Sequence, residues 1–355
     1  MIRPFDIRDV SVVQRLSPLG RALAYELFAV DGLSPLREAL RTYAAGGSDH
    51  RAALVRRSAD HNTEAFGLLQ FLDDPSNEDR PDSTRQDHAD LVRNGDKPRY
   101  AALLFMAPAP RNADIAAVWV ELAQFMVSYA GERGAVHLIA EAPDTGREAD
   151  ALYSAGFSPL VHQDVLKLPR IPDDADTIHI ERVAGETVEL RPQKESDEPL
   201  IRLLAMRTVP KLVQRAEITS DLARLTHRID CGFNLFNKGE LTGHVSVRRG
   251  RRGYSLQLLF HPSAETQVEA ALRYALGQIG GRTHHRPIYC TVPSYQSWLL
   301  PTLGRLGFAH VTSNILMIRH TIATVKQPVW SLDARGATGG VVHSKPNAHQ
   351  AVRQA

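Results

Sequence analysis

The chain has 355 residues, a formal net charge of +2 and 23% charged residues, the balance of an ordinary soluble protein. This length exceeds one ordinary core, so we expect two domains. With only Cys231 and Cys290, the chain excludes a disulfide framework and a cysteine-based metal site, and we expect two reduced core thiols. The polar start is no signal peptide and no apolar run approaches the ~20 residues of a membrane span, so we expect a cytoplasmic protein without membrane contact.

Residues 1–169 alternate apolar strands with amphipathic helices. In chain order the pattern predicts a strand at 2–5, helical material at 10–43, strands at 51–57, 65–72 and 100–106, a helix at 112–131, a strand at 135–140, a helix at 145–155 and a strand at 161–168. The run at 100–106 is apolar almost throughout, as in a central strand buried on both faces. Residues 73–99 are rich in Asp, Arg and Pro and predict a mobile loop.

The helix at 112–131 has the clearest helical signal. Asn112 can cap its start and Gly131 can end it. Its apolar residues recur at helical spacing along one face: Ile115, Val118, Trp119, Leu122, Met126 and Tyr129. The sequence therefore predicts a capped helix with one apolar face.

After an acidic linker at 170–186, residues 187–325 repeat the same order of elements. The pattern predicts a strand at 188–190, helical material at 195–228, strands at 231–236, 241–247 and 254–260, a helix at 268–279, a strand at 288–292, a helix at 295–306 and a strand at 311–318. Pro301 should kink the last helix or delay its start. Residues 326–355 predict a disordered tail.

Two short stretches occur in both halves. Ile2-Arg3-Pro4 is matched by Leu190-Arg191-Pro192 at the start of each half. Near the end, Ala155-Gly156-Phe157 is matched by Leu306-Gly307-Phe308, and each leads into a strand-like run. An opening and a closing marker that both occur twice predict one fold used twice.

This order of elements, closing twice on Gly-Phe, resembles the GNAT superfamily of N-acetyltransferases over nearly all of residues 1–325. The resemblance implies an α/β fold of two tandem domains, each a mixed central sheet flanked by helices. It also implies direct acyl transfer from acetyl-CoA to the amine of a small molecule or peptide. In that family the pantetheine arm lies where the central strand splays from its neighbour, and glycines in the next turn admit the pyrophosphate.

Carried onto this sequence, the resemblance favours the first half for binding acetyl-CoA. The implied contacts are Met106 and Ala107 at the end of the central strand and Arg111, Asn112, Ala113 and Ala116 in the turn. Asp114 stands at the family's first glycine, and the second-half turn at 261–268 has no glycine and contains Glu265. Acidic residues also complement a helix N-terminus, so the alternative is a non-catalytic binding or regulatory protein with degenerate sites.

Two residues of the first half are candidates for proton transfer. Glu141 ends the strand beside the expected gap and could act as general base, or could simply be solvated. Tyr153 lies one residue after the position of the family's leaving-group tyrosine, so it could be the acid or a surface residue. That position itself holds Leu152, and Leu303 in the second half.

The remaining polar motifs have both functional and ordinary interpretations. The family's asparagine near the start of the last helix falls at about Thr145 and at Gln296, an amide that could substitute. His261 could take an amine proton or cap a helix. The basic turn at 248–253 could contact RNA, but hairpin arginines also protect against aggregation, so we expect exposed arginines and no nucleic-acid partner. The histidines show no metal-ligand spacing.

Overall fold

A computed structural model describes residues 1–45, 50–58, 63–72, 100–171, 188–215, 230–280 and 286–321. Residues Met1–Ala323 form one compact unit. The loop predicted at 73–99 and the tail predicted at 326–355 lie outside the described residues, as does nearly all of the linker at 170–186. The domain boundaries drawn from the sequence stay predictions.

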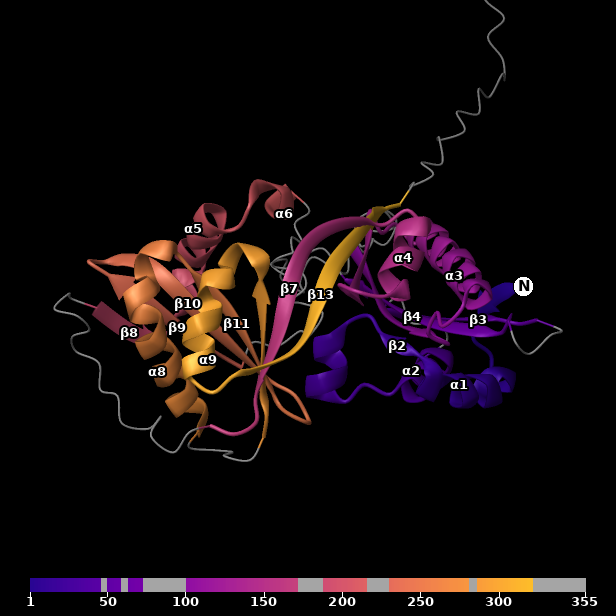
Figure 1. The fold of residues 1–355 in the computed structure, drawn as a ribbon, viewed down its shortest axis with the longest axis horizontal. Coiled ribbons are helices and arrows are strands. Elements are labelled where there is room, and N and C mark those ends of the chain that lie inside the picture. Colours follow the sequence, from indigo (N-terminus) through magenta and orange to yellow (C-terminus); the bar gives the residue numbers. More distant parts are fainter. Residues whose placement is uncertain are drawn as a thin grey trace, which may run out of the picture. The chain divides into compact units, whose positions relative to one another are not determined.

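The same order of helices and strands occurs twice along the chain, as predicted (Figure 1). The first half contains β1 (Ile2–Pro4), α1 (Val10–Leu16), β2 (Arg21–Ala22), α2 (Pro35–Ala44), β3 (Arg51–Arg56), β4 (Ala65–Leu72), β5 (Tyr100–Ala107), α3 (Ala113–Glu132), β6 (His137–Pro143), α4 (Arg147–Ser154) and β7 (Ser158–Leu168). The second half contains β8 (Val188–Pro192), α5 (Glu198–Thr208), α6 (Lys211–Arg215), β9 (Cys231–Asn237), β10 (Glu240–Arg249), β11 (Tyr254–Phe260), α8 (Val268–Gly280), β12 (Ile288–Pro293), α9 (Leu300–Arg305) and β13 (Ala309–His320). Of the strands and α-helices named here, only β2 has no counterpart among the described residues of the second half.

The described strands form a single mixed sheet of thirteen strands. Its order is β1-β3-β4-β5-β6-β13-β7-β12-β11-β10-β9-β8, with β2 paired to β5 off this path. The pairs β5–β6 and β11–β12 are parallel, and the other pairs are antiparallel. This is the predicted α/β class with a mixed sheet flanked by helices.

The two half-sheets are joined because their closing strands are exchanged. β13, the last strand of the second half, pairs with β6 of the first half, whereas β7 pairs with β12 of the second half. β7 and β13 also pair with each other, and Figure 1 shows them as two long neighbouring strands between the halves. Each half therefore completes the sheet of the other.

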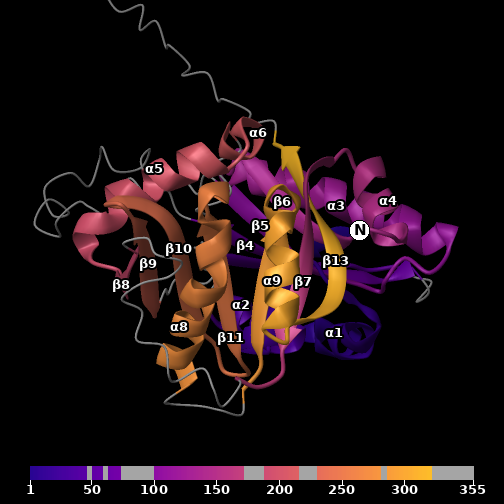
Figure 2. The same cartoon turned by 60° about the vertical axis from the view of Figure 1, so that its left-hand side comes forward.

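Helices cover both faces of the first half-sheet. Residues of α1 and α2 belong to one apolar cluster, and residues of α3 and α4 belong to another that lies on the opposite sides of β3, β4 and β5. In the second half, α8 and α9 pack against β9–β12 in a third cluster (Figure 2). No helix in the described part of the chain is long and apolar enough to cross a membrane.

The long helix α3 follows its predicted signals closely. Asn112 accepts the Ile115 N–H at 2.9 Å and so caps the helix start. The predicted apolar stripe is the buried face, with Trp119 and Leu122 fully enclosed. The helix ends at Glu132, one residue beyond the predicted Gly131.

The opening sequence echo encodes the same ion pair in both halves. Arg3 Nη1 lies 2.8 Å from Asp9 Oδ2, and Arg191 Nη1 lies 2.7 Å from Asp197 Oδ2. Both carboxylates are buried, and each also accepts a main-chain N–H three residues upstream at 2.9 Å. The repeated Arg-Pro therefore marks a clamp between the first strand and the first helical turn.

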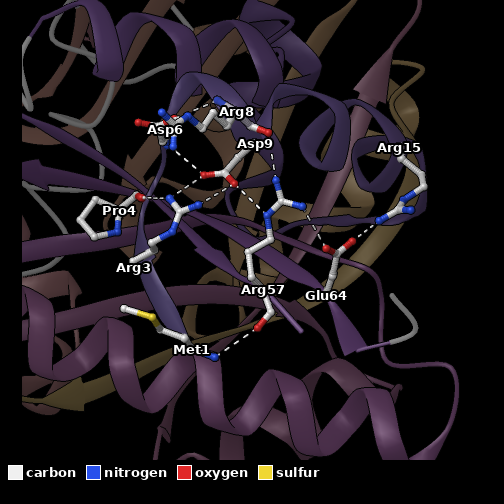
Figure 3. A network of polar contacts seen from close by, with 9 residues as sticks. All are labelled: Met1, Arg3, Pro4, Asp6, Arg8, Asp9, Arg15, Arg57 and Glu64. Carbon is white, nitrogen blue, oxygen red and sulfur yellow. Dashed lines mark hydrogen bonds and ion pairs between the residues drawn. The ribbon is translucent and has the colours of Figure 1, made fainter. Parts of the chain in front are cut away.

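The two clamps differ in their third partner. In the first half Arg57 Nε also donates to Asp9 at 2.9 Å and links it to Glu64 (Figure 3). In the second half a neutral amide replaces that cation, because Asn234 Nδ2 donates to Asp197 Oδ2 at 2.9 Å. The Arg191 guanidinium holds the pKa of Asp197 well below its usual range.

The closing echo is a helix end that needs glycine. Gly156 and Gly307 adopt left-handed backbone with φ of 88° and 90°. The following phenylalanine N–H donates to the carbonyl of Leu152 or Leu303 at 3.0 Å, so each helix ends in the same capped turn. As predicted, Pro301 falls in the first turn of α9, after a 3₁₀ helix at Ser294–Leu299.

Candidate functional site

Each half has a gap where two parallel strands diverge. β5 and β6 pair only from Tyr100 opposite His137 to Leu103 opposite Ala140. β11 and β12 pair only from Tyr254 opposite Ile288 to Leu256 opposite Cys290. The gap between diverging strands is the place where the family resemblance puts the pantetheine arm.

The first gap is filled by the chain itself, through a segment that we call the gap segment, Leu19–Tyr25. The Leu23 N–H donates to the Leu104 carbonyl at 2.8 Å, and the Leu23 carbonyl accepts the Glu141 N–H at 2.9 Å. Leu23 thus bridges β5 and β6 as an inserted strand would. While the gap segment is in place, a pantetheine arm cannot reach these main-chain groups.

Further contacts fix the N-terminal end of the gap segment. Arg21 pairs with Met106 in the sheet, and its guanidinium lies 2.8 Å from the buried carboxylate of Glu148 on α4. At Gly20 the chain runs so close to β5 that a Cβ would lie 2.1 Å from the Phe105 ring. Only glycine fits there, which explains how the segment enters the gap.

Glu141 lies in the first gap, as predicted, and it holds the gap segment. Its carboxylate accepts the Tyr25 N–H at 2.9 Å. Burial raises the pKa of Glu141 to about 7, and the nearby charge of Glu26 adds to this, although the bond from Tyr25 opposes it. A carboxylate with this pKa can exchange a proton near neutrality, but here it faces the chain's own backbone.

The predicted cofactor residues of the first half lie around the filled gap. Met106 and Ala107 are fully buried, and β2 covers the edge of β5 at Met106. The turn residues Arg111, Asn112 and Ala113 are exposed and Ala116 is half-buried. Their role in binding acetyl-CoA stays a prediction, and it would require the gap segment to leave the gap.

The predicted tyrosine acid lies on a surface of α4. Tyr153 is 42% exposed, whereas Leu152, at the family's tyrosine position, is fully buried. Leu303 is buried in the same way in the second half. A catalytic role for Tyr153 stays a prediction that no contact of its ring with a described residue supports.

The second gap has no strand paired within it among the described residues. Beyond Leu256, β11 continues through Gln257, Leu258 and Leu259 to Phe260 and, among the described strands, is paired only on its β10 side. Gln257, Leu258 and Leu259 are half-buried, unlike the fully buried end of β5. The open edge of β11 therefore offers main-chain N–H and C=O groups that an extended ligand could bind.

Two side chains at the start of the helix after β12 have unused polar groups. Gln296 is 1% exposed, yet neither its amide oxygen nor its amide nitrogen has a partner among the described residues. Tyr295 packs in the same apolar cluster as Leu259 of β11, and burial raises its pKa to about 12. Gln296 was anticipated from the resemblance. Tyr295 was missed because it does not stand at the family's tyrosine position.

The turn after β11 is a poor site for a pyrophosphate. It forms a 3₁₀ helix at Pro262–Gln267, and Pro262 has no N–H to offer. His261 Nδ1 accepts the Ser263 N–H at 3.2 Å, so this histidine is a helix cap, the second of its two predicted roles. With Glu265 in the first turn, this end of the gap presents few free donors to an anion.

The basic hairpin between β10 and β11 docks on the first half through Arg248, which is buried contrary to expectation, whereas Arg249, Arg251 and Arg252 are exposed as expected. Arg248 is 7% exposed and donates to both carboxylate oxygens of Asp31 at 2.9 Å and to Glu26 at 3.0 Å. Arg251 donates to the Asp31 carbonyl at 3.1 Å. Sequence reasoning missed this contact because it joins residues more than two hundred positions apart.

The cysteines and histidines carry no metal site in the described part of the chain. Cys290 is buried as predicted, and burial raises the pKa of its thiol. Cys231 is exposed at the start of β9, so its expected core position was wrong. A strand-like apolar run does not reveal that its first residue extends past the core.

Comparisons with known proteins agree with this architecture. No protein-family model and no curated protein matches the sequence. A GCN5-related N-acetyltransferase from Sphaerobacter thermophilus is 12% identical with a TM-score of 0.50, over 90% of this chain and 95% of that chain. A tandem GNAT protein from the clavulanic acid biosynthesis pathway is 14% identical with a TM-score of 0.48, over 90% of this chain and 98% of that chain. A GCN5-related N-acetyltransferase from Anabaena variabilis is 13% identical with a TM-score of 0.40, over 90% of this chain and 72% of that chain.

The chain therefore has the fold of the GCN5-related N-acetyltransferases, used in tandem. This confirms the resemblance read from the Gly-Phe motifs and the predicted fold class. At these identities the likeness establishes the fold alone.

Proposed function

We propose that the protein is a GNAT-type N-acyltransferase whose acyl-CoA site lies in its second half. The observation that carries this proposal is the contrast between the gaps: the gap segment fills the first, and no described strand is paired within the second. A pantetheine arm is an extended chain with amide groups. It can add to the free edge of β11 as a strand adds to a sheet.

The buried polar atoms beside the second gap fit such a ligand. An amide buried without partners costs about 1–3 kcal/mol, and it is retained where a ligand completes its hydrogen bonds. Gln296 is such a group and would bind the amides of the pantetheine arm. Tyr295 keeps its proton at neutral pH because burial raises its pKa to about 12, so its hydroxyl could protonate a leaving thiolate.

When bound, acyl-CoA would supply an acyl group activated as a thioester. The acceptor would be an amine of a small molecule or peptide, as the family resemblance implies. The turn at Pro262–Gln267 gives the pyrophosphate little support, so the pantetheine arm would provide most of the affinity. That same turn is the observation that favours the second candidate, a non-catalytic tandem fold.

Calorimetric titration with acetyl-CoA tests the proposal in three proteins. The wild type should bind, and Gln296→Met should bind about tenfold or more weakly, because it removes both amide atoms but keeps the side chain's length. Arg111→Ala is the matched control in the first half and should bind as the wild type does. Acetyl transfer to a panel of amines should follow the same order.

Two outcomes would overturn the proposal. Loss of binding in Arg111→Ala but not in Gln296→Met would move the site to the first half. Absence of any acetyl-CoA binding by the wild type, with no rise in melting temperature at high ligand concentration, would leave the non-catalytic fold as the better account.

A further inference from the structure

A second, shallow and open site lies between the first half and the basic hairpin. It has a volume of about 470 Å³ and is lined by Ala22, Tyr25, Phe28, Ala29, Arg252, Pro287 and Tyr289. Small-molecule sites span roughly 300–1,000 Å³ and occur preferentially where two parts of a chain meet. Its size and location suit one small molecule.

Aromatic rings form much of its wall and are held in place. The rings of Tyr25 and Tyr289 meet edge to face with centroids 6.3 Å apart. Phe28 stacks on Phe105 of β5 at 5.7 Å. Such preorganised rings favour a planar ring as ligand, because stacking gains little from a saturated one.

The polar groups at this site have no partners inside the described part of the protein. The hydroxyls of Tyr25 and Tyr289 make no hydrogen bond there, and the guanidinium of Arg252 makes neither a hydrogen bond nor an ion pair. The neighbouring Arg248 and Arg251 differ, since both are bound to the segment at Glu26–Gly32. Arg252 is therefore a hairpin arginine whose charge remains available to an anion.

The backbone fixes the stem of Arg252 at the rim. Its N–H donates to the Val30 carbonyl at 2.8 Å. Its side chain lies against Gly32, where a Cβ would come within 2.3 Å of Arg252 Nε. Gly32 has a φ of +63°, a left-handed conformation that glycine adopts without strain. Lys167 Nζ, 5.8 Å from the Tyr289 ring centroid, adds a second positive charge nearby.

We propose that this site binds a small aromatic carboxylate, with its ring against Tyr25, Phe28 and Tyr289 and its carboxylate on Arg252. A guanidinium binds a carboxylate through two parallel N–H donors, which gives both affinity and orientation. The site does not depend on the acyl-CoA proposal, because none of its lining residues is one that we assign to acyl-CoA.

The experiment uses the full-length protein and indole-3-acetate as probe, followed by titration and by saturation-transfer NMR. Indole-3-acetate should bind, whereas its neutral analogue indole-3-acetamide and the saturated analogue cyclohexaneacetate should each bind more weakly. Arg252→Gln should weaken binding about ten- to a hundredfold, the loss expected for one charge-assisted contact. Because Arg252 is exposed, this change should leave the fold intact.

Arg249→Gln is the control, since Arg249 is an exposed arginine of the same hairpin that does not line the site. It should bind indole-3-acetate as the wild type does. Equal losses in the two variants would show a general effect of hairpin charge and overturn the proposal. So would equal binding of the carboxylate and the amide, or no binding of indole-3-acetate.

Discussion

The two halves share a frame and differ in the gap where the parallel strands diverge. Both halves keep the Arg–Asp clamp at the first strand and the glycine-capped helix before the last strand. In the first gap, Leu23 bonds to both β5 and β6, whereas in the second no described strand lies between β11 and β12. The two halves thus share the contacts that hold the sheet together, whereas the gap between the parallel strands is filled in one half and open in the other.

The two Arg–Asp clamps should give the largest effects on stability, and comparing them tests how similar the two halves are. Arg191→Ala should lower the free energy of unfolding by about 3–5 kcal/mol, because it leaves the buried Asp197 carboxylate without a cation. Arg3→Ala should cost less, since Arg57 still donates to Asp9. Urea denaturation at neutral pH measures both values, and equal losses would contradict the difference in third partners.

The same pair has a defined pH dependence. The pKa of Asp197 lies below its unfolded value, so the clamp stabilises the fold above about pH 4 and this contribution is lost as the pH falls further. The deficit of Arg191→Ala relative to the wild type should therefore shrink in acid. A deficit that stays constant down to pH 2 would mean that packing rather than charge explains it.

In the basic hairpin, two adjacent arginines should contribute differently to the stability of the fold. Arg248→Ser should lower the free energy of unfolding by about 1.5–3 kcal/mol, because it removes charge-assisted bonds to Asp31 and Glu26. Arg249→Ser should cost less than about 0.5 kcal/mol, since its exposed side chain forms no such bond to a described residue. Thermal unfolding compares the two variants. Equal melting temperatures would show that the contact of Arg248 with Asp31 and Glu26 does not stabilise the fold.

The unsatisfied amide beside the second gap makes an unusual prediction about stability. Without ligand, Gln296→Met should leave the protein as stable as the wild type or more stable by about 1–3 kcal/mol, because it replaces unpartnered buried polar atoms. With saturating acetyl-CoA the wild type should gain about 1.4 kcal/mol or more relative to the variant, because it binds at least tenfold more tightly. Differential scanning calorimetry with and without ligand would show the stability difference shift toward the wild type by this amount, and a variant that is less stable in both conditions contradicts this account.

The last prediction concerns Glu141 in the first gap and is a change of slope with pH. Its pKa rises from 4.5 in the reference state to about 7 in the fold, so the folded protein holds a proton that the unfolded chain has lost between these values. Stability of the wild type should therefore fall as the pH rises from 4.5 to 7, by at most about 1.4 kcal/mol per pH unit. Glu141→Gln keeps an oxygen for the Tyr25 N–H and should lack this slope. Parallel stability curves for the two proteins would show that Glu141 titrates normally.

Local signals in the sequence predicted the fold well where the contacts are local. The apolar stripe of α3, its Asn112 cap and the Gly-Phe helix ends all have the predicted form, since each depends on residues within one or two turns. The exchange of β7 and β13 could not be foreseen. The alternation of apolar and polar residues predicts that a segment is a strand, but it does not show which half-sheet that strand joins.

The sequence predicted some residues of the candidate site but not the segment that fills the first gap. Glu141 and Gln296 could be placed by counting from neighbouring elements: Glu141 lies in the first gap, and Gln296 lies in the 3₁₀ helix that follows β12. The gap segment escaped detection because β2 is only Arg21–Ala22, too short to show alternation, and its partners lie on β5 and β6. The family resemblance pointed to the first half through Arg111, but a turn motif carries no information about what fills the adjacent gap.

Hydrogen–deuterium exchange with acetyl-CoA tests most directly whether the second gap is the binding site. Peptides that cover Gln257–Phe260 should exchange more slowly when acetyl-CoA is present, because the ligand would bond to the free edge of β11. Peptides that cover the gap segment and Leu104–Ala107 should be unchanged, since that gap is already closed by the chain. Protection confined to β5 and the gap segment, with none on β11, would contradict the account.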